Sequence, residues 1–226
     1  MRRGSLGAGA NADMGRGSLA TGANADTGRG TLVAGASAAL LLVPAIAHAH
    51  LVNTGLGPLY DGISHLFLTF DDLLPVVALA LLAGLNGPIA GRRVLFALPV
   101  AWLAGGLAGY LSAVALLPAG ITALSLLALG ILTAADRKVG SPIMTGLAVA
   151  LGLMHGWLNG AAIALAGREA TGLIGITGAI FVLAALASAL VIALRLPWTR
   201  IAVRVTGSWI AATGLLLLGW TLSGRL

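Results

Sequence analysis

Residues 61–85 read DGISHLFLTFDDLLPVVALALLAGL, a long apolar run that contains a histidine and an acidic pair. The run does not alternate apolar and polar residues, so it predicts a helix rather than a strand. Its length exceeds the ~20 residues that a helix needs to cross the hydrocarbon core of a bilayer. We therefore predict a membrane-spanning helix at residues 62–85.

Five further apolar runs follow, at residues 94–114, 117–135, 142–166, 172–194 and 201–222. Hydrophobic residues make up 58% of the chain and charged residues only 9%, with a mean hydropathy of +1.00. A soluble protein of this length needs a more charged surface. The sequence predicts an all-α integral membrane protein in which residues 50–226 form a domain of six transmembrane helices.

The first 49 residues have a different composition. The unit RGSLGAGANAD at 3–13 returns as RGSLATGANAD at 16–26, and we expect residues 1–30 to be a disordered leader or the product of an early start codon. Residues 31–49 resemble a signal peptide, with an apolar run at 32–46 and the small-x-small motif AHA at 47–49. Cleavage after Ala49 would make His50 the mature N-terminus; the alternative is an uncleaved anchor.

Basic residues indicate the orientation of the chain. Alternate loops carry most of them: Arg92, Arg93, Arg137, Lys138, Arg195, Arg200 and Arg204. The remaining loops and the tail carry only Arg168, which Glu169 balances, and Arg225. Positive residues mark the cytoplasmic side, so we expect both mature termini on the outer side of a bacterial-type inner membrane. This pattern accounts for the net charge of +6 without a nucleic-acid partner.

The first span carries ionisable residues that are costly inside a bilayer, roughly a few kcal/mol each. On a continuous helix, Asp61, His65 and Asp72 share one face, while Asp71 points about 100° away from Asp72. His65 and Asp72 are then about 10 Å apart along the axis, so joint ligation needs a kink or a relay. Asp61 also suits a helix N-cap, and His65 also suits a buried imidazole bonded to one neighbour.

The fourth span places His155 and Asn159 four residues apart on one helical face, a spacing that suits two ligands or one relay. Beside them, Ala148, Gly152, Gly156 and Gly160 form a stripe of small residues that predicts close packing against another helix. No serine, base and acid arrangement is present, and the chain has no cysteine. We therefore expect neither an enzyme nor a thiolate metal site.

These two spans resemble the HupE/UreJ family of small membrane proteins, which accompany hydrogenases and ureases and are taken to be nickel or cobalt permeases. The family's first helix carries a His-Pro…Asp-His element. His65 stands in the place of its first histidine, Asp71 in that of its aspartate and Asp72 in that of its second histidine. Leu66 replaces the proline and Thr69 a glycine, so the sequence does not predict a helix break here.

A later helix of the family carries a His-Gly-x-Ala-His-Gly-x-Glu element. His155 and Gly156 match its start, Asn159 stands where its second histidine belongs, and Ala162 stands where its glutamate belongs. The resemblance thus implies a metal site of His65, Asp71, Asp72, His155 and Asn159. Asp61 is a possible secondary residue because it lies one helical turn from His65 and could share an ion with it. More oxygen and less imidazole shift the preference of such a site toward harder cations.

The resemblance implies a permease for a divalent transition metal, nickel or cobalt, with no resident cofactor. A free amine on His50 would offer two nitrogen donors as an outer capture point, although His50 is equally read as the residue after a cleavage site. One lone copy is small for a pathway, so a homo-oligomer or a metalloenzyme-maturation partner is expected. Two alternatives stay open: a channel for protons or a small neutral solute, and a non-transporting accessory subunit.

Overall fold

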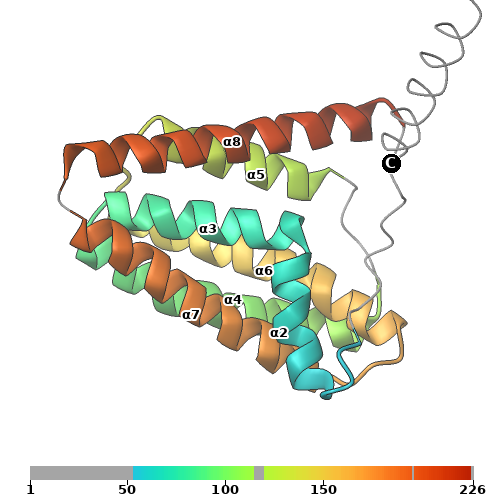
Figure 1. The fold of residues 1–226 in the computed structure, drawn as a ribbon. Coiled ribbons are helices and arrows are strands. Elements are labelled where there is room, and N and C mark those ends of the chain that lie inside the picture. Colours follow the sequence, from blue (N-terminus) through green and yellow to red (C-terminus); the bar gives the residue numbers. More distant parts are fainter. Residues whose placement is uncertain (1–52, 115–119, 195, 225–226) are drawn as a thin grey trace, which may run out of the picture. The chain divides into compact units, whose positions relative to one another are not determined.

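The computed structural model describes residues 53–114, 120–194 and 196–224, all within one compact unit of the chain, His48–Leu226. The expected leader, signal peptide and His50 lie outside the described residues. The described residues form helices and no strand (Figure 1). These helices are α2 (Pro58–Leu68), α3 (Phe70–Leu85), α4 (Pro88–Ser112), α5 (Ile121–Ala134), α6 (Ser141–Leu165), α7 (Thr171–Ala193) and α8 (Pro197–Leu222).

The helices lie at the six predicted positions, but they do not form six single spans. Within the described residues, α4, α6, α7 and α8 are each long and apolar enough to cross a membrane. The helices α2 and α3 pass that test only as a pair, and α5 has 14 residues. At 1.5 Å per residue, α5 is about 21 Å long, shorter than a hydrocarbon core of about 30 Å. The all-helical class is confirmed, and the prediction of six continuous spans is not.

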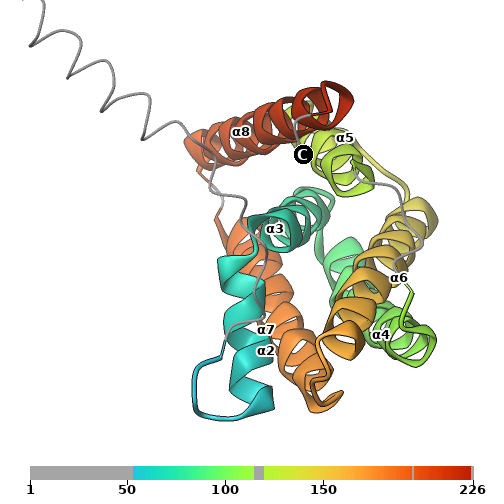
Figure 2. The same ribbon diagram turned by 90° about the vertical axis from the view of Figure 1, so that its right-hand side faces the viewer.

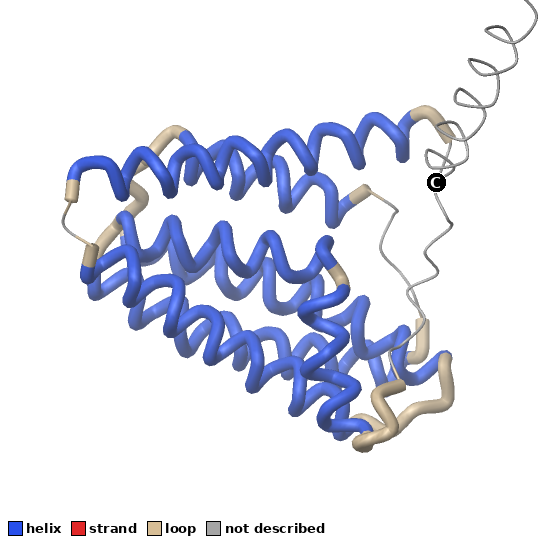
Figure 3. Tube along the Cα trace, in the orientation of Figure 1, coloured by secondary structure: helices blue, strands red, loops and turns tan. Residues whose placement is uncertain are grey.

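The first predicted span is broken, contrary to expectation. The helices α2 and α3 meet at Thr69 with a bend of 74°, and Figure 3 shows the short loop between them. Thr69 has an extended backbone (φ −102°, ψ 91°), which any residue can adopt, so neither proline nor glycine is required. Threonine is also a weak helix former because its β-branch restricts χ1.

Prolines begin several of these helices. Pro58, Pro88 and Pro142 lie in the first turns of α2, α4 and α6. Proline suits this position because the first backbone N–H groups of a helix have no intrahelical acceptor, so its missing N–H is not lost. The two-residue connection between α3 and α4 reverses the chain direction at Gly87, whose φ of 98° favours glycine.

Small residues bring α4 and α6 into backbone contact. A Cβ added to Gly156 would meet the backbone of Trp102 and Gly106, and one added to Gly160 would meet Gly106 and Tyr110. The glycine stripe of the fourth predicted span therefore packs on α4, as its spacing predicts. The helix pairs α2–α7 and α5–α8 also pack closely through small residues, for example where Gly62 contacts Gly172.

The helix α3 lies in the middle of the bundle. Figure 2 looks along the helices and shows α3 surrounded by the others, in agreement with its contacts to α4, α5, α6, α7 and α8. Its apolar side chains Val76, Leu79 and Leu82 are fully buried. By contrast, α8 exposes large apolar side chains such as Trp209 and Leu216, as expected of a face toward lipid.

Charged residues gather at the two ends of the helices. We call one the basic end; it holds the α3–α4, α5–α6 and α7–α8 connections and residues Arg92, Arg93, Arg137, Lys138, Arg200 and Arg204. There Arg200 pairs with Asp136 at 2.5 Å, and Lys138 Nζ donates to the Leu85 carbonyl at 2.8 Å. The opposite end, which we call the Asp61 end, holds the start of α2 and the α6–α7 connection.

Candidate functional site

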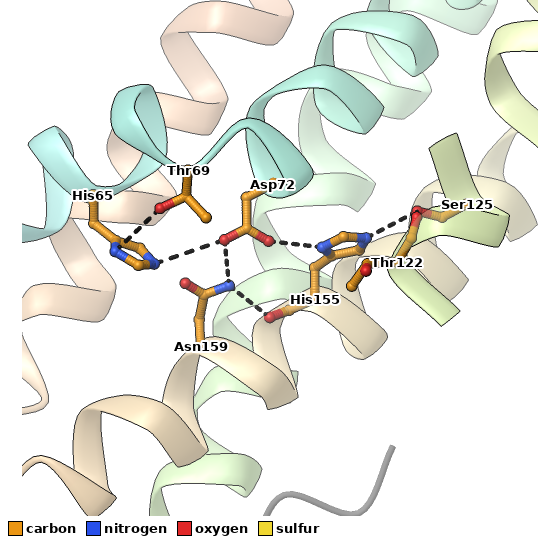
Figure 4. Close-up of polar contacts among 7 residues, drawn as sticks. All are labelled: His65, Thr69, Asp72, Thr122, Ser125, His155 and Asn159. Atoms are coloured by element: carbon orange, nitrogen blue, oxygen red, sulfur yellow. Dashed lines mark hydrogen bonds and ion pairs between the residues drawn. The ribbon is translucent and has the colours of Figure 1, made fainter. Parts of the chain in front are cut away.

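Four of the predicted site residues meet inside the bundle, and we call them the buried centre: His65, Asp72, His155 and Asn159 (Figure 4). Asp72 Oδ1 lies 2.7 Å from His155 Nδ1, and Asp72 Oδ2 accepts a hydrogen bond from Asn159 Nδ2 at 2.9 Å. His65 Nε2 lies 3.7 Å from Asp72 Oδ2. One carboxylate therefore joins side chains from α2, α3 and α6.

The break at Thr69 makes this arrangement possible. On a straight helix His65 and Asp72 would stand about two turns apart, whereas the 74° bend brings the His65 ring beside the Asp72 carboxylate. The bend also places Asp72 in the first turn of α3, where backbone N–H groups and the helix dipole favour negative charge. His155 and Asn159 come from one face of α6, one turn apart, and Asn159 Nδ2 also donates to the His155 carbonyl at 2.9 Å.

The buried centre is almost closed to its surroundings. His155 is completely buried, and Asp72, Asn159 and His65 are 5–6% exposed. A buried carboxylate is stable only when it is paired and hydrogen-bonded, and Asp72 has both kinds of partner here. The centre thus concentrates two imidazoles, a carboxylate and an amide where a bilayer would otherwise exclude them.

Polar contacts continue from the centre on both sides. His65 Nδ1 lies 3.3 Å from Thr69 Oγ1, and His155 Nε2 lies 3.1 Å from Ser125 Oγ on α5. Ser125 Oγ donates its own hydrogen to the Thr122 carbonyl at 2.7 Å, so His155 Nε2–H donates to Ser125.

Two buried polar atoms of this region have no hydrogen-bond partner among the described residues: Asn159 Oδ1 and Trp102 Nε1. Figure 4 shows Asn159 Oδ1 on the side of the carboxamide that faces His65. Leaving a buried acceptor unpaired costs roughly 1–3 kcal/mol, so such an atom marks a place where a further donor or a cation would be stabilised. Trp102 stacks on the His155 ring, with centroids 5.4 Å apart and planes 22° apart, and fixes its orientation.

Other predicted residues do not join the centre. The Asp71 side chain is half-buried, and within the described residues no hydrogen bond or ion pair links it to the four residues of the buried centre. Asp61 does not contact His65; it accepts hydrogen bonds from Thr54 and pairs with Arg168 at 3.1 Å. The expectation that Asp61 caps α2 is wrong, because the N-cap position is Gly57. Asp61 lies a full turn inside and is used for a tertiary contact instead.

Within the described residues, no group of three or more His, Cys, Asp and Glu side chains has the spacing of a metal site. His155 Nδ1 and Asp72 Oδ1 lie 2.7 Å apart, the distance of a hydrogen bond. The role of the centre as a metal site therefore stays a prediction. Sequence reasoning missed Ser125 and Trp102; a serine inside an apolar run was a usable signal for the first, and nothing marked the second.

The comparisons with known proteins agree with the resemblance noted from the sequence. Residues 38–217 match the family model described as "HupE / UreJ protein". No curated protein and no solved structure matches the chain. The matched region includes every helix that contributes to the buried centre. The chain therefore belongs to the HupE/UreJ family.

Proposed function

We propose that this protein is a membrane permease for a divalent transition-metal ion, nickel or cobalt, and that the ion passes through the buried centre. The family is associated with nickel and cobalt accessory functions of ureases and hydrogenases. The observation that carries the proposal is the meeting of His65, Asp72, His155 and Asn159 inside the bundle, beside an unpartnered buried oxygen.

The spacing of the donor atoms suits a cation on one side of Asp72. Two ligands that bind one ion at about 2.0–2.2 Å lie about 3–3.7 Å apart. His65 Nε2 and Asp72 Oδ2 are 3.7 Å apart, and the free Asn159 Oδ1 lies on the same side of the carboxylate. His155 instead holds Asp72 Oδ1 at 2.7 Å, which is how an outer partner orients a ligating carboxylate.

The proposed site is sparse, and this favours transport over storage. Conduction requires an ion to bind well enough to enter and weakly enough to leave. One imidazole, one carboxylate oxygen and one amide oxygen leave several coordination positions to water. With the basic end toward the cytoplasm, the Asp61 end faces outward in a plasma membrane. A metalloenzyme-maturation partner would then receive the ion at the basic end.

Metal flux into proteoliposomes tests this function. The Asp72→Asn and His155→Ala variants should lower the initial rate of nickel or cobalt entry by about tenfold or more, the usual effect of losing a ligand or its support. A matched control is Ser188→Ala on α7, a buried polar side chain that bonds only within its own helix. Entry that is the same in all four proteins would overturn the proposal.

The second candidate is a path for protons or a small neutral solute. It is favoured by the continuous series of contacts from Thr69 through His65, Asp72 and His155 to Ser125. Such a relay needs no metal, so proton or solute flux into liposomes prepared with a chelator would support it. Metal entry without that flux would support the permease instead.

A further inference from the structure

A cavity of about 230 Å³ opens at the Asp61 end, between the start of α2, the α6–α7 connection and the start of α7. Its charged lining residues are Asp61, Arg168 and Glu169, and its apolar lining includes Ile163 and Ile176. A water molecule takes about 30 Å³ of the liquid, so this cavity has room for a small hydrated ion. Its position at the end of the helices connects it to the water phase.

None of the four residues of the buried centre lines the cavity, although its lining residues on α2 and α6 lie one helical turn from two of them. Asp61 is one turn before His65 on α2, and Ile163 is one turn after Asn159 on α6, so about 6 Å of helix separates the two levels. The intervening apolar side chains are tightly buried, with Leu66 and Ile176 at 0% and Ile163 at 3% exposure. An apolar layer therefore closes the route between the cavity and the centre.

An ion pair holds this layer together. Arg168 Nη1 lies 3.1 Å from Asp61 Oδ2 and joins the α6–α7 connection to α2. Asp61 Oδ1 is held at 2.7 Å by both Thr54 N and Thr54 Oγ1. The Arg168 carbonyl is in turn held by the Tyr110 hydroxyl of α4 at 3.2 Å, so one side of the pair is anchored.

The other side of the pair belongs to the short helix α2, which packs on α7 through Gly62 and Gly175. The helix α2 has 11 residues and joins α3 through Thr69, whose extended backbone carries the 74° bend. Rotation about that residue would move His65 and Leu66 together, away from Ile163 and Ile176. The ion pair lies near the end of α2 that is farthest from Thr69, where it restrains rotation of the helix most effectively.

We propose that the cavity is an entrance site for a hydrated divalent cation and that the Asp61–Arg168 pair is the latch of a gate between this site and the buried centre. This inference rests on the proposed function for the identity of the ion. The gate itself is a property of the chain and is tested without any metal.

The chain has no cysteine, so single-cysteine reporters can be read without background. Ile163→Cys reports on the floor of the cavity, and Asn159→Cys reports on the centre beneath it. Each reporter is placed in the full chain in lipid nanodiscs and treated with a cationic, water-soluble methanethiosulfonate. With the latch intact, the cysteine at 163 should react faster than the cysteine at 159.

Adding Asp61→Asn or Arg168→Gln should speed the reaction at position 159 by about two- to fivefold, the modest effect expected of a partly exposed ion pair. Arg168→Lys, which keeps the charge, should leave the reaction slow. The matched control is Arg200→Gln, which breaks the Asp136 pair at the basic end and should leave position 159 unchanged. A second reporter, Leu66→Cys, should respond in the same way as position 159.

An unchanged reaction at positions 66 and 159 after both latch substitutions would overturn the gate. So would an equal increase with Arg200→Gln, because it would indicate general loosening. The two proposals fail separately. Labelling that responds to the latch in a protein without metal flux would leave the gate and remove the permease. Metal flux that depends on Asp72, together with unresponsive labelling, would do the reverse.

Discussion

Replacing Gly156 by alanine should separate α4 from α6 and disturb the buried centre. A Cβ at this position would lie 2.9 Å from Gly106 N and closer still to the Trp102 carbonyl, whereas ordinary contact begins at about 3.4 Å. The α4 backbone must therefore recede by at least about half an ångström, because neither contact atom is on a flexible side chain. Trp102 stacks on His155 from that same segment.

The expected cost follows from two opposing effects. Forcing an extra carbon into a packed interface costs about 1–3 kcal/mol, and alanine returns up to about 1 kcal/mol over glycine in a helix interior. The net loss of about 1–2 kcal/mol should lower Tm by about 2–8 °C in a protein of this size. The rate of metal flux should fall further than the loss of stability alone would explain, because the displacement of α4 moves Trp102, which stacks on His155.

Gly146→Ala on the same helix is the matched control, since a Cβ there meets nothing within 4 Å. It carries the same gain in helix propensity without the clash, so its Tm should be unchanged or higher. Thermal unfolding of both variants in one detergent, followed by tryptophan fluorescence, gives the comparison. Equal Tm values for the two alanine variants would refute the reasoning that α4 and α6 meet backbone to backbone.

Three further outcomes are expected. Asp72→Asn should keep Tm within a few degrees, because the asparagine side chain can accept a hydrogen bond from Asn159 and donate one to His155. Asp72→Leu should lose about 2–6 kcal/mol of stability, because it leaves two buried polar groups unpaired. Similar Tm values for the two variants would contradict this account. His155→Ala should cost about 3–5 kcal/mol in chemical denaturation because it strands a buried carboxylate. His65→Ala should cost less, since His65 lies 3.7 Å from Asp72, and the opposite ranking would contradict the observed geometry. Thr133→Val should cost about 0.5–1 kcal/mol by removing the hydrogen bond from Thr133 to the Ala78 carbonyl between α5 and α3, and a neutral Tm would mean that this bond adds nothing.

Much of the helical architecture could be predicted because hydropathy acts locally. Each apolar run near or above 20 residues must be satisfied as a helix in lipid, whatever its neighbours are. The glycine stripe beside His155 could be read in the same way, since spacing of four residues places small side chains on one face. Family membership followed from a few residues around His65 and His155, and the family match confirms it.

The break at Thr69 could not be predicted, because no local signal encodes it. Neither proline nor glycine stands there, and the extended conformation is open to every residue type. The bend is fixed by contacts that are distant in sequence, such as Gly62 against Gly172. One expectation from the sequence did anticipate the effect of this break: His65 and Asp72 can act together only across a kink or a relay.

The residues that form the candidate site could be predicted better than the contacts between them. His65, Asp72, His155 and Asn159 do lie together, although their role as metal ligands stays a prediction. Asp71 and Asp61 were expected to join the site, but within the described residues Asp71 makes no hydrogen bond to it and Asp61 pairs with Arg168. Ion pairs between residues 107 positions apart leave no trace in a single sequence.

That separation has a consequence for how the protein is made. The helix α2 is about 16 Å long, half the thickness of the hydrocarbon core, so it cannot settle in the bilayer as an independent span. Arg168, its anchor, leaves the ribosome 107 residues after Asp61, roughly 5–20 s later at ordinary rates of synthesis. During that interval the N-terminal segment must wait, undocked, at the translocation machinery or the lipid surface. The ion pair that joins α2 to the α6–α7 connection consequently forms only after most of the chain has been made.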